Sequence, residues 1–421
     1  MKQKSGRRLG LRWWIISLVT VGTVLNYLAR STLSVAAPTL MEELGMSTEN
    51  YSFVVLSFQM TYTVMQTVAG TILDILGTRL GFFLFAVGWA IANMAHGLAT
   101  SWQGLAFFRG LLGATEAAAI PAGAKSVSEW FPASERPLAT SAFQMGTSVG
   151  AIIAPPLVVF CILTWGWQSA FLVTGGLSLF WAALWWFGYD TPQRHSRITA
   201  KERAFIEEGQ AAEQSTGRPA TRKEVIQSRG FWAIAIPRFF AEPAWQTFNF
   251  FIPLYLVAVW QLDLKSIAMW AWMPFLAADL GSLAAGLMPA WLMRRGASTL
   301  ASRKITMTIG ALCMIGPACI GLAGSPGLAI ALFCVGGFAH QMLNGALITL
   351  CSDVFDSKMV GTASGMAGTA AWIGGMLFTL LIGQSADSYG YSPLFVALAA
   401  LDLVGMAVLW GLLREKMGVK N

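Results

Sequence analysis

Three arginines lie inside long apolar stretches, and their chemistry is the clearest in the chain: Arg30, Arg109 and Arg238. A charged side chain at the centre of a membrane span costs roughly 3 kcal/mol on insertion scales, so each is a candidate functional residue. A guanidinium can form two parallel hydrogen bonds with a carboxylate, and a cation in an otherwise uncharged cavity selects anions. We therefore expect Arg30 to bind an anion. The alternative is a structural ion pair, although Ala29 precedes Arg30 and no acid lies within its own turn.

Glu116 follows Arg109 by seven residues, which is two helical turns, so both project from one face of a helix. They are too far apart to pair directly but can share a polar network. Desolvation favours the neutral form of a carboxyl, whereas a nearby cation favours the charged form. Glu116 is therefore suited to binding a proton on one side of a membrane and releasing it on the other. The alternative is a permanent buried ion pair that braces the helix.

A second polar stripe consists of Arg238, Glu242, Trp245 and Asn249, at spacings of 4, 3 and 4 residues along one helical face. Arg238 and Glu242 can pair along the helix. An aromatic plane with amide groups suits a sugar ring, so Trp245 and Asn249 are candidate binding residues, with interhelical packing an equal alternative for the aromatic ring. The other polar candidates within apolar runs are Tyr62, His340 and Gln341.

Composition shows what kind of elements must position these residues. The chain has 421 residues, of which 55% are hydrophobic and 12% charged, against roughly 25% charged in a soluble domain. Its 43 Gly fit membrane helices, which tolerate glycine. We expect an all-α integral membrane protein embedded in a lipid bilayer.

No catalytic, metal or cofactor site is indicated. The five cysteines lack CxxC spacing, which argues against a disulfide framework and a zinc site. The segment 146–150 matches GxSxG, but a nucleophile elbow needs a preceding strand, and this segment lies in an apolar helix. We therefore expect no enzyme activity and no cofactor.

Apolar runs long enough to span a bilayer as helices need about 20 residues. Twelve are predicted, near 12–37, 51–73, 80–99, 103–127, 138–163, 168–188, 230–258, 266–291, 304–323, 327–350, 361–384 and 392–413. With the N-terminus inside, 24 Lys and Arg fall on one side and only Lys265 on the other. By the positive-inside rule both termini are cytoplasmic. The net charge of +7 therefore reflects membrane orientation rather than nucleic-acid binding.

The polar segment 189–229 divides the chain into two halves of six spans each. We interpret 1–188 and 230–421 as two six-helix bundles and 189–229 as a partly helical cytoplasmic linker. A shift of 224 residues aligns Ser128–Phe131 with Ser352–Phe355, which is weak evidence of a repeat. Two parallel repeats indicate a transporter whose halves rock about a site near the membrane midplane.

The loop between the second and third spans carries the most specific motif. Its pattern is GxxxDxxGxR, formed by Gly70, Asp74, Gly77 and Arg79. This loop resembles the signature loop of the major facilitator superfamily, which implies the fold of two pseudo-symmetric six-helix bundles. The glycines would permit a tight turn and close helix contact, and Asp74 would form hydrogen bonds in one gating state only. The alternative is an ordinary loop with a solvated Asp–Arg pair.

Further segments narrow the resemblance. Asn26–Arg30 and Arg109–Ala117 resemble the first and fourth helices of the anion:cation symporter family. Ala36–Leu44, Pro237–Trp245 and Gly336–Gln341 resemble the bacterial hexuronate transporters within it. The resemblance implies proton-coupled uptake of galacturonate and glucuronate, with Glu116 as the coupling acid, Arg109 as its electrostatic tuner and Tyr62 as a binding residue.

The sequence thus predicts a monomeric symporter in a bacterial inner membrane, whose partners are a sugar acid anion and a proton. By the resemblance, many relatives have an acid at the place of Ala29, so we expect Glu116 to titrate alone here and one proton to accompany each uronate. The alternative is that Glu242 supplies a second proton, which pairing with Arg238 would oppose because it holds Glu242 ionised. Transport would then be electroneutral. Two alternatives stay open: another anion, such as an aldonate or an aromatic acid, and a transport-fold sensor.

Overall fold

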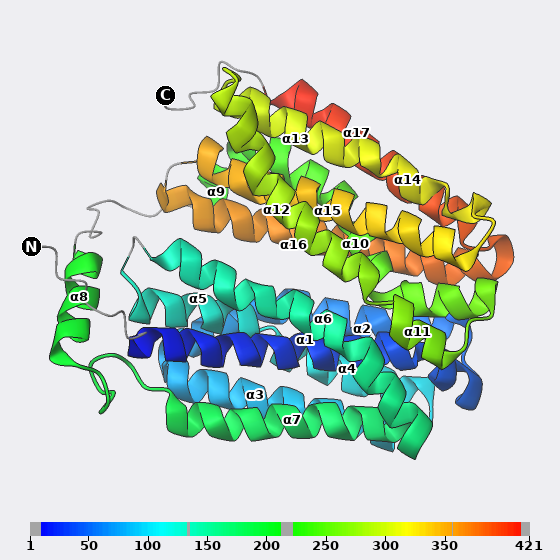
Figure 1. Cartoon of the computed structure of the whole chain (residues 1–421), viewed down its shortest axis with the longest axis horizontal. Helices are drawn as coiled ribbons and strands as arrows, with labels where there is room; N and C mark the ends of the chain where they lie inside the picture. The colour runs from blue at the N-terminus through cyan, green and yellow to red at the C-terminus, as the bar shows by residue number, and fades with distance from the viewer. Residues whose placement is uncertain (1–9, 133–134, 212–221, 356, 414–421) are drawn as a thin grey trace, which may run out of the picture. The chain divides into compact units, whose positions relative to one another are not determined.

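The computed structural model describes residues 10–132, 135–211, 222–355 and 357–413, and this part of the chain contains helices and no strand (Figure 1). Several residues used for the orientation lie outside the described ranges: Lys2, Lys4, Arg7, Arg8, Arg218, Arg414, Lys416 and Lys420. Residues 212–221 of the expected linker lie outside them as well.

The helices coincide with the twelve predicted runs. The first six runs correspond to α1 (Leu11–Glu43), α2 (Thr48–Leu76), α3 (Thr78–Ala95) with η1 (His96–Leu98), α4 (Trp102–Glu116) with α5 (Ala119–Trp130), α6 (Arg136–Trp165) and α7 (Trp167–Gly188), and α1 and α2 extend beyond their runs. Two helices, α8 (Ala200–Ala211) and α9 (Arg222–Gln227), lie within 189–229. The last six contain α10 (Arg229–Trp260), α11 (Leu264–Trp270) with α12 (Met273–Arg294), α13 (Thr299–Cys313) with α14 (Ile315–Ala318) and η2 (Ile320–Leu322), α15 (Pro326–Val354), α16 (Ser357–Tyr389) and α17 (Ser392–Leu412).

Nine of these runs are long and apolar enough to cross a membrane, counted over the described residues. The other three hold α2, the α4–α5 pair and α10, which carry Tyr62, Glu116 and Glu242 respectively. These three less apolar spans therefore bear most of the candidate polar residues. Polarity within a span that must still cross the bilayer is typical of a transport pathway.

The predicted span 103–127 is two helices, because α4 ends at Glu116 and α5 begins at Ala119. Pro121 lies in the first turn of α5 and has no N–H group, so it cannot continue the hydrogen-bond ladder of α4. Glu116 consequently lies at the carboxyl end of α4, fourteen residues from Trp102 and fourteen from Trp130. This position is the middle of the span.

The described chain forms two compact units. Unit 1 comprises 1–32 and 57–216, and unit 2 comprises 33–56 and 217–421. The segment 33–56, from α1 and α2, belongs to unit 2 because it packs there: the Tyr51 hydroxyl donates to the Phe250 carbonyl at 2.8 Å. A Cβ on Gly383 would lie 2.6 Å from the Ser52 side chain, so α16 and this segment touch closely.

The core of unit 1 is aromatic where α3 and α7 run side by side (Figure 1). Trp89 and Trp181 stack with ring centroids 5.9 Å apart, and Phe82 meets Trp181 edge to face at 5.3 Å. The Trp181 indole donates to the Leu18 carbonyl at 3.0 Å, which ties this core to α1. Since Gly22 has no Cβ, α1 can approach the Trp181 ring closely. This core holds the helix that carries Arg30.

The linker helix α8 docks onto the start of α1. Glu202 accepts hydrogen bonds from the backbone N–H groups of Leu11 at 3.0 Å and Arg12 at 3.1 Å, and pairs with the Arg12 guanidinium at 3.0 Å. A Cβ on Gly10 would lie 2.2 Å from a Glu202 oxygen, so a larger residue there would displace the Glu202 side chain. Acceptors at a helix N-terminus satisfy its free N–H groups, which explains the acid at this place.

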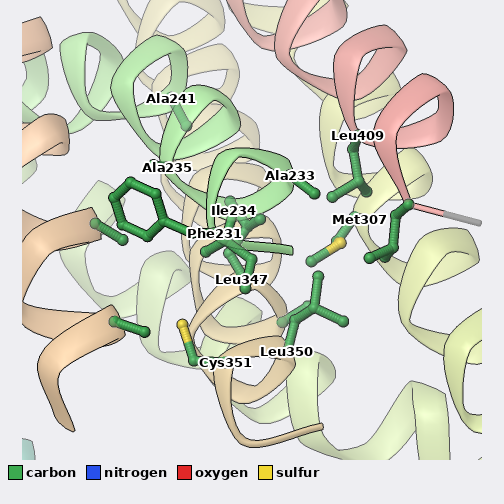
Figure 2. Packing of buried hydrophobic residues seen from close by; sticks show 14 of the residues in the cluster. Phe231, Ala233, Ile234, Ala235, Ala241, Met307, Leu347, Leu350, Cys351 and Leu409 are labelled. Carbon is green, nitrogen blue, oxygen red and sulfur yellow. The ribbon is translucent and has the colours of Figure 1, made fainter. Parts of the chain in front are cut away.

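Unit 2 has an aliphatic core where α10, α13, α15 and α17 converge (Figure 2). Ile234, Met307, Leu347 and Leu409 come from these four helices and are all 2% exposed or less. Such close packing fixes the amino-terminal half of α10, the helix that bears the second polar stripe.

Helices α10 and α16 approach unusually closely next to that stripe. Pro243 has no N–H group, so it leaves the carbonyl of Phe239, four residues earlier, without its helical partner. Gly374 lies against this carbonyl, because a Cβ there would be 2.0 Å from the Phe239 oxygen. Only glycine allows α16 to cover the freed carbonyl in this way.

Candidate substrate and proton site

Arg30 and Glu116 form a buried ion pair in unit 1. Arg30 is on α1 and its Nε donates to Oε2 of Glu116 on α4 at 3.0 Å. The Arg30 side chain is 8% exposed and that of Glu116 is not exposed. The acid that balances Arg30 therefore comes from another helix, 86 residues along the chain. The structural pairing considered from sequence is present, and it joins the two residues predicted to bind the anion and the proton.

Three aromatic rings enclose the Arg30 guanidinium. Its central carbon lies 4.5 Å from the ring centroid of Tyr27, 4.6 Å from that of Tyr62 and 5.0 Å from that of Phe58. These distances are within the range of cation–π interactions, which strengthen when water is excluded. The rings hold a charged group in a dry site and fix the plane of the guanidinium. Tyr62, predicted as a substrate-binding residue, is thus 2% exposed and beside the anion-binding candidate.

Arg109 holds the backbone next to the Arg30–Glu116 pair. It is fully buried, and its Nη2 donates to the backbone carbonyl of Arg30 at 2.8 Å. Its guanidinium also lies 4.8 Å from the Phe58 ring. The polar network predicted from the spacing of Arg109 and Glu116 therefore has Arg30 as its third member. Arg109 holds the backbone that carries Arg30 and adds a second positive charge near Glu116.

The Arg30–Glu116 pair leaves hydrogen-bonding capacity open. Within the described ranges no hydrogen bond is formed by Nη2 of Arg30 or by Oε1 of Glu116, and both atoms are buried. Nε and Nη2 are the two donors on one edge of a guanidinium, the edge that binds a carboxylate with two parallel hydrogen bonds. Glu116 occupies only one of these donors. A carboxylate that replaced Glu116 could use both.

The polar stripe on α10 in unit 2 has a different arrangement from the one predicted. Among the residues described, Arg238 and Glu242 form no ion pair; Glu242 instead accepts a hydrogen bond from the Gln246 amide at 2.8 Å. The Arg238 guanidinium points to α16, since its Nη1 is 3.9 Å from a Cβ built on Gly368. The predicted pairing within the helix is therefore wrong: Gln246, one turn further on, takes the carboxylate.

Trp245 and His340 stack face to face in unit 2. Their ring centroids are 5.4 Å apart and their planes differ by 7°. His340, on α15, is 1% exposed, whereas Trp245 is half-buried. His340 thus fixes one face of the Trp245 ring. Asn249 donates to the Trp245 carbonyl at 2.8 Å. Gln341 is half-buried beside His340 in sequence, on α15.

The signature loop forms two separate ion pairs rather than an Asp–Arg pair. Asp74 pairs with Lys125 of α5, and Arg79 pairs with Asp190 at 2.9 Å. Gly77 has φ +77°, a left-handed conformation that favours glycine, so the predicted tight turn is confirmed there. The predicted close helix contact is not found at Gly70, where a Cβ would meet open space.

A part-buried hydrogen-bonded cluster lies in unit 1 where α3 begins and α5 and α7 end. Glu129 accepts hydrogen bonds from the Tyr189 hydroxyl and, at 2.6 Å, from the Thr78 hydroxyl. Burial, and then the nearby Glu129 carboxylate, raise the pKa of Tyr189 well above 10. Tyr189 therefore remains a hydrogen-bond donor at physiological pH, and the cluster joins the ends of α3, α5 and α7.

Sequence reasoning missed one acid. Asp402 on α17 is 2% exposed, and within the part of the chain that the structure describes neither of its carboxylate oxygens has a hydrogen-bond partner. It is the only charged residue of α17. The rule that singled out Arg30, a charge inside an apolar span, would also have found it. No group of three His, Cys, Asp or Glu side chains able to hold a metal ion occurs among the described residues.

Comparison with known proteins identifies the family of this chain. Residues 19–379 match the family model of the Major Facilitator Superfamily. The chain belongs to the major facilitator superfamily. Its fold is accordingly the all-α membrane fold of twelve transmembrane helices in two six-helix bundles, as predicted. It is 51% identical to the hexuronate transporter of Escherichia coli K12, covering 98% of this chain and 96% of that protein.

Two other matches extend the comparison. The chain is 49% identical to the galacturonate transporter of Dickeya chrysanthemi, over 76% of this chain and 94% of that protein. Among solved structures it is similar to a bacterial homologue of the human lysosomal transporter Spinster, with a TM-score of 0.79, 16% identity, and 97% and 98% of the two chains covered. At that identity the structural match supports the fold alone.

Proposed function

We propose that this protein imports a hexuronate, galacturonate or glucuronate, together with protons by alternating access. The observation that carries the proposal is the buried Arg30–Glu116 pair, which combines an anion-binding group and a protonatable group in one contact. The 51% identity to a hexuronate transporter supports the choice of substrate. The function requires no catalysis and no cofactor, since the proton gradient supplies the driving force.

In this mechanism the substrate carboxylate and Glu116 compete for Arg30. A proton that binds the Glu116 carboxylate removes its charge and releases Nε of Arg30. The guanidinium edge, Nε with the open Nη2, then binds the uronate carboxylate through two parallel hydrogen bonds. After the site opens inward, release of the uronate lets Arg30 attract Glu116 again, and the proton leaves to the cytoplasm. Arg109 favours this last step because it adds positive charge.

The sugar ring is assigned to other residues. In unit 1, Tyr62 beside Arg30 offers a hydroxyl. In unit 2, Trp245, whose ring stacks on His340 and meets Phe275 edge to face, offers its half-buried ring, and Asn249 and Gln341 offer amide groups. Gating is assigned to the signature loop, Gly70–Arg79, whose Asp74 and Arg79 hold separate partners.

The proposal places the protein in a bacterial inner membrane as a monomer with both termini in the cytoplasm. The distribution of basic residues supports this orientation, since 24 Lys and Arg fall on one side of the twelve spans and only Lys265 on the other.

The test is uptake into proteoliposomes with a panel of labelled acids under an inward proton gradient. Galacturonate and glucuronate should accumulate, and unlabelled uronate should compete. D-galactonate is the informative rival, because the chain is also 28% identical to a D-galactonate transporter of Escherichia coli. Accumulation of galactonate but not of uronate would show that the substrate is an aldonate and would leave the proposed proton-coupled mechanism in place. No accumulation of any acid would contradict the proposal.

A further inference from the structure

Asp402 occupies the centre of a membrane span. It lies ten residues from each end of α17, Ser392–Leu412, in which every other residue is uncharged. Glu116 has the same central position in its own span. The Asp402 carboxyl faces protein rather than lipid, since the residue is 2% exposed. A carboxyl at this depth is costly when ionised and is kept in membrane proteins chiefly for a function.

Contacts along α17 show where Asp402 lies in unit 2. Arg229 donates to the Gly411 carbonyl at 3.0 Å, a Cβ on Gly405 would be 3.2 Å from the Pro237 Cα, and the rings of Phe395 and Tyr255 meet at 5.2 Å. The numbering rises along α10 as it falls along α17, so the two helices are antiparallel. Interpolating between these contacts places Asp402 level with residues 241–244 of α10. That is the level of Glu242, in the half of α10 that bears the polar stripe.

At the level of Asp402, the charged groups of α10 point away from α17. Arg238 lies against Gly368 of α16, and Cγ of Glu242 is 3.4 Å from a Cβ built on Gly375 of α16. The side of α10 at the level of Asp402 that is free of these groups bears Ala241 and Ala244, which are 3% and 1% exposed. Neither charge of the stripe is therefore directed at Asp402.

In the part of the chain that the structure describes, the other helices packed on α17 give no charged partner either. On α13, Lys304 donates to the Leu413 carbonyl at the inner end of α17, and Arg303 pairs with Asp353. Helices α14 and η2 have no charged residue. On α16, Asp387 lies near the outer end, where it accepts from the Thr48 amide. Among the described residues, Asp402 is thus an isolated acid, unlike Glu116 with its arginine.

We propose that Asp402 is a second proton-binding residue of the transport cycle, so that two protons accompany each uronate. The inference rests on the proposed function. An acid without a cation has nothing to stabilise its carboxylate in a dry site, so it binds a proton there and can release it only when water reaches it. The proton adds to the Asp402 carboxylate and leaves from the carboxylic acid, with no other bond changed. Two protons and one uronate carry one net positive charge inward, in place of the neutral cycle expected from Glu116 alone.

The decisive experiment is uronate accumulation driven by an imposed membrane potential at equal pH on both sides of proteoliposomes. The wild type should accumulate uronate tenfold for about each 59 mV, interior negative, the value for one net charge. Asp402→Asn, which has the shape of the neutral acid, should keep pH-driven uptake and lose the response to potential. Asp263→Asn, in the loop between α10 and α11, is the matched control and should behave as wild type.

Two results would overturn the proposal: a wild type that does not respond to potential, or an Asp402→Asn variant that responds as the wild type does. Loss of uronate exchange in Asp402→Asn would also count against it, because exchange needs no net proton movement. Infrared difference spectra of the purified protein without substrate give an independent readout. The carbonyl band of a protonated carboxylic acid should weaken in Asp402→Asn, and an unchanged band would contradict the proposal even if uronate is not the substrate.

Discussion

The polar residues of the two units differ in how their charges are balanced. In unit 1, Arg30 and Glu116 pair at 3.0 Å and are enclosed by aromatic rings. In unit 2, Glu242 binds an amide and Asp402 binds nothing among the residues described. A pair whose members exchange partners can couple an anion to a proton, whereas an acid without a cation can only bind or release a proton. The comparison predicts that substitutions in unit 1 affect anion coupling most.

The largest effect is expected for Glu116→Gln. Glutamine cannot carry a proton or compete with a uronate for Arg30, so the proton coupled through this pair is lost and pH-driven accumulation should fall steeply while uronate exchange persists. Glu242→Gln is the matched change in unit 2 and should leave most accumulation intact. Paired uptake and exchange assays in proteoliposomes measure both. Accumulation by Glu116→Gln at the wild-type level would show that Glu116 does not couple the proton. Equal losses of accumulation in the two variants would show that the two units do not differ in this respect.

Arg30→Lys should have the next largest effect. Lysine keeps the positive charge but loses the planar edge that binds a carboxylate twice, and a hydrogen bond to a charged group contributes about 1.5–3 kcal/mol. Uronate binding should weaken roughly ten- to a hundredfold. Arg238→Lys in unit 2, whose guanidinium is aimed at α16, should change affinity little. Binding measured by titration calorimetry checks both, and near-wild-type affinity of Arg30→Lys would contradict two-point recognition of the carboxylate.

A smaller effect is expected where the sugar ring is assigned. His340→Ala removes the ring that backs Trp245, and an aromatic pair contributes about 0.5–1.5 kcal/mol beyond its buried area. The KM for uronate should rise by roughly two- to tenfold, with the pH dependence of uptake unchanged. Trp232→Phe, on the same helix as Trp245 but 44% exposed, is the control. An altered pH dependence in His340→Ala would place His340 in proton coupling instead.

The smallest effect should come from the signature loop. The Asp74 side chain is 74% exposed, and such surface ion pairs contribute only about 0–1 kcal/mol. Asp74→Asn and Lys125→Gln should therefore shift the gating equilibrium modestly and to the same extent, because they break the same pair. Labelling of single cysteines placed in the inner and outer vestibules reports the shift. Opposite shifts in the two variants would show that Asp74 acts through another partner.

The sequence was sufficient for the fold because a membrane imposes it locally. Each span needs its own apolar length, so the twelve runs could be located without knowing what packs against them. The break between α4 and α5 after Glu116 was not predicted. Pro121 also fits the first turn of a helix, so the sequence alone does not show whether a new helix begins there; that depends on how the segment packs against its neighbours. Gly77 was predicted correctly for the same local reason, since a turn in the left-handed region depends on one residue.

The site was predicted in its members but not in its contacts. Arg30 and Glu116 were both identified, yet their pairing joins helices 86 residues apart, and no spacing within one helix could indicate it. The reverse error occurred at Arg238 and Glu242, where helical spacing permitted a pair that Gln246 and α16 prevent. Spacing gives the face of a helix, whereas the partner depends on which other helix covers that face.

Helix α10 contains three prolines, Pro237, Pro243 and Pro253, and yet it is continuous from Arg229 to Trp260. Each proline removes one hydrogen bond from the helix, so the energy needed to bend α10 is lower in its central part than in an uninterrupted helix. Trp245 and Asn249 lie between the second and third prolines. The residues assigned to the sugar ring are therefore carried by a mechanically soft segment, which can adjust its curvature around a bound molecule without unfolding.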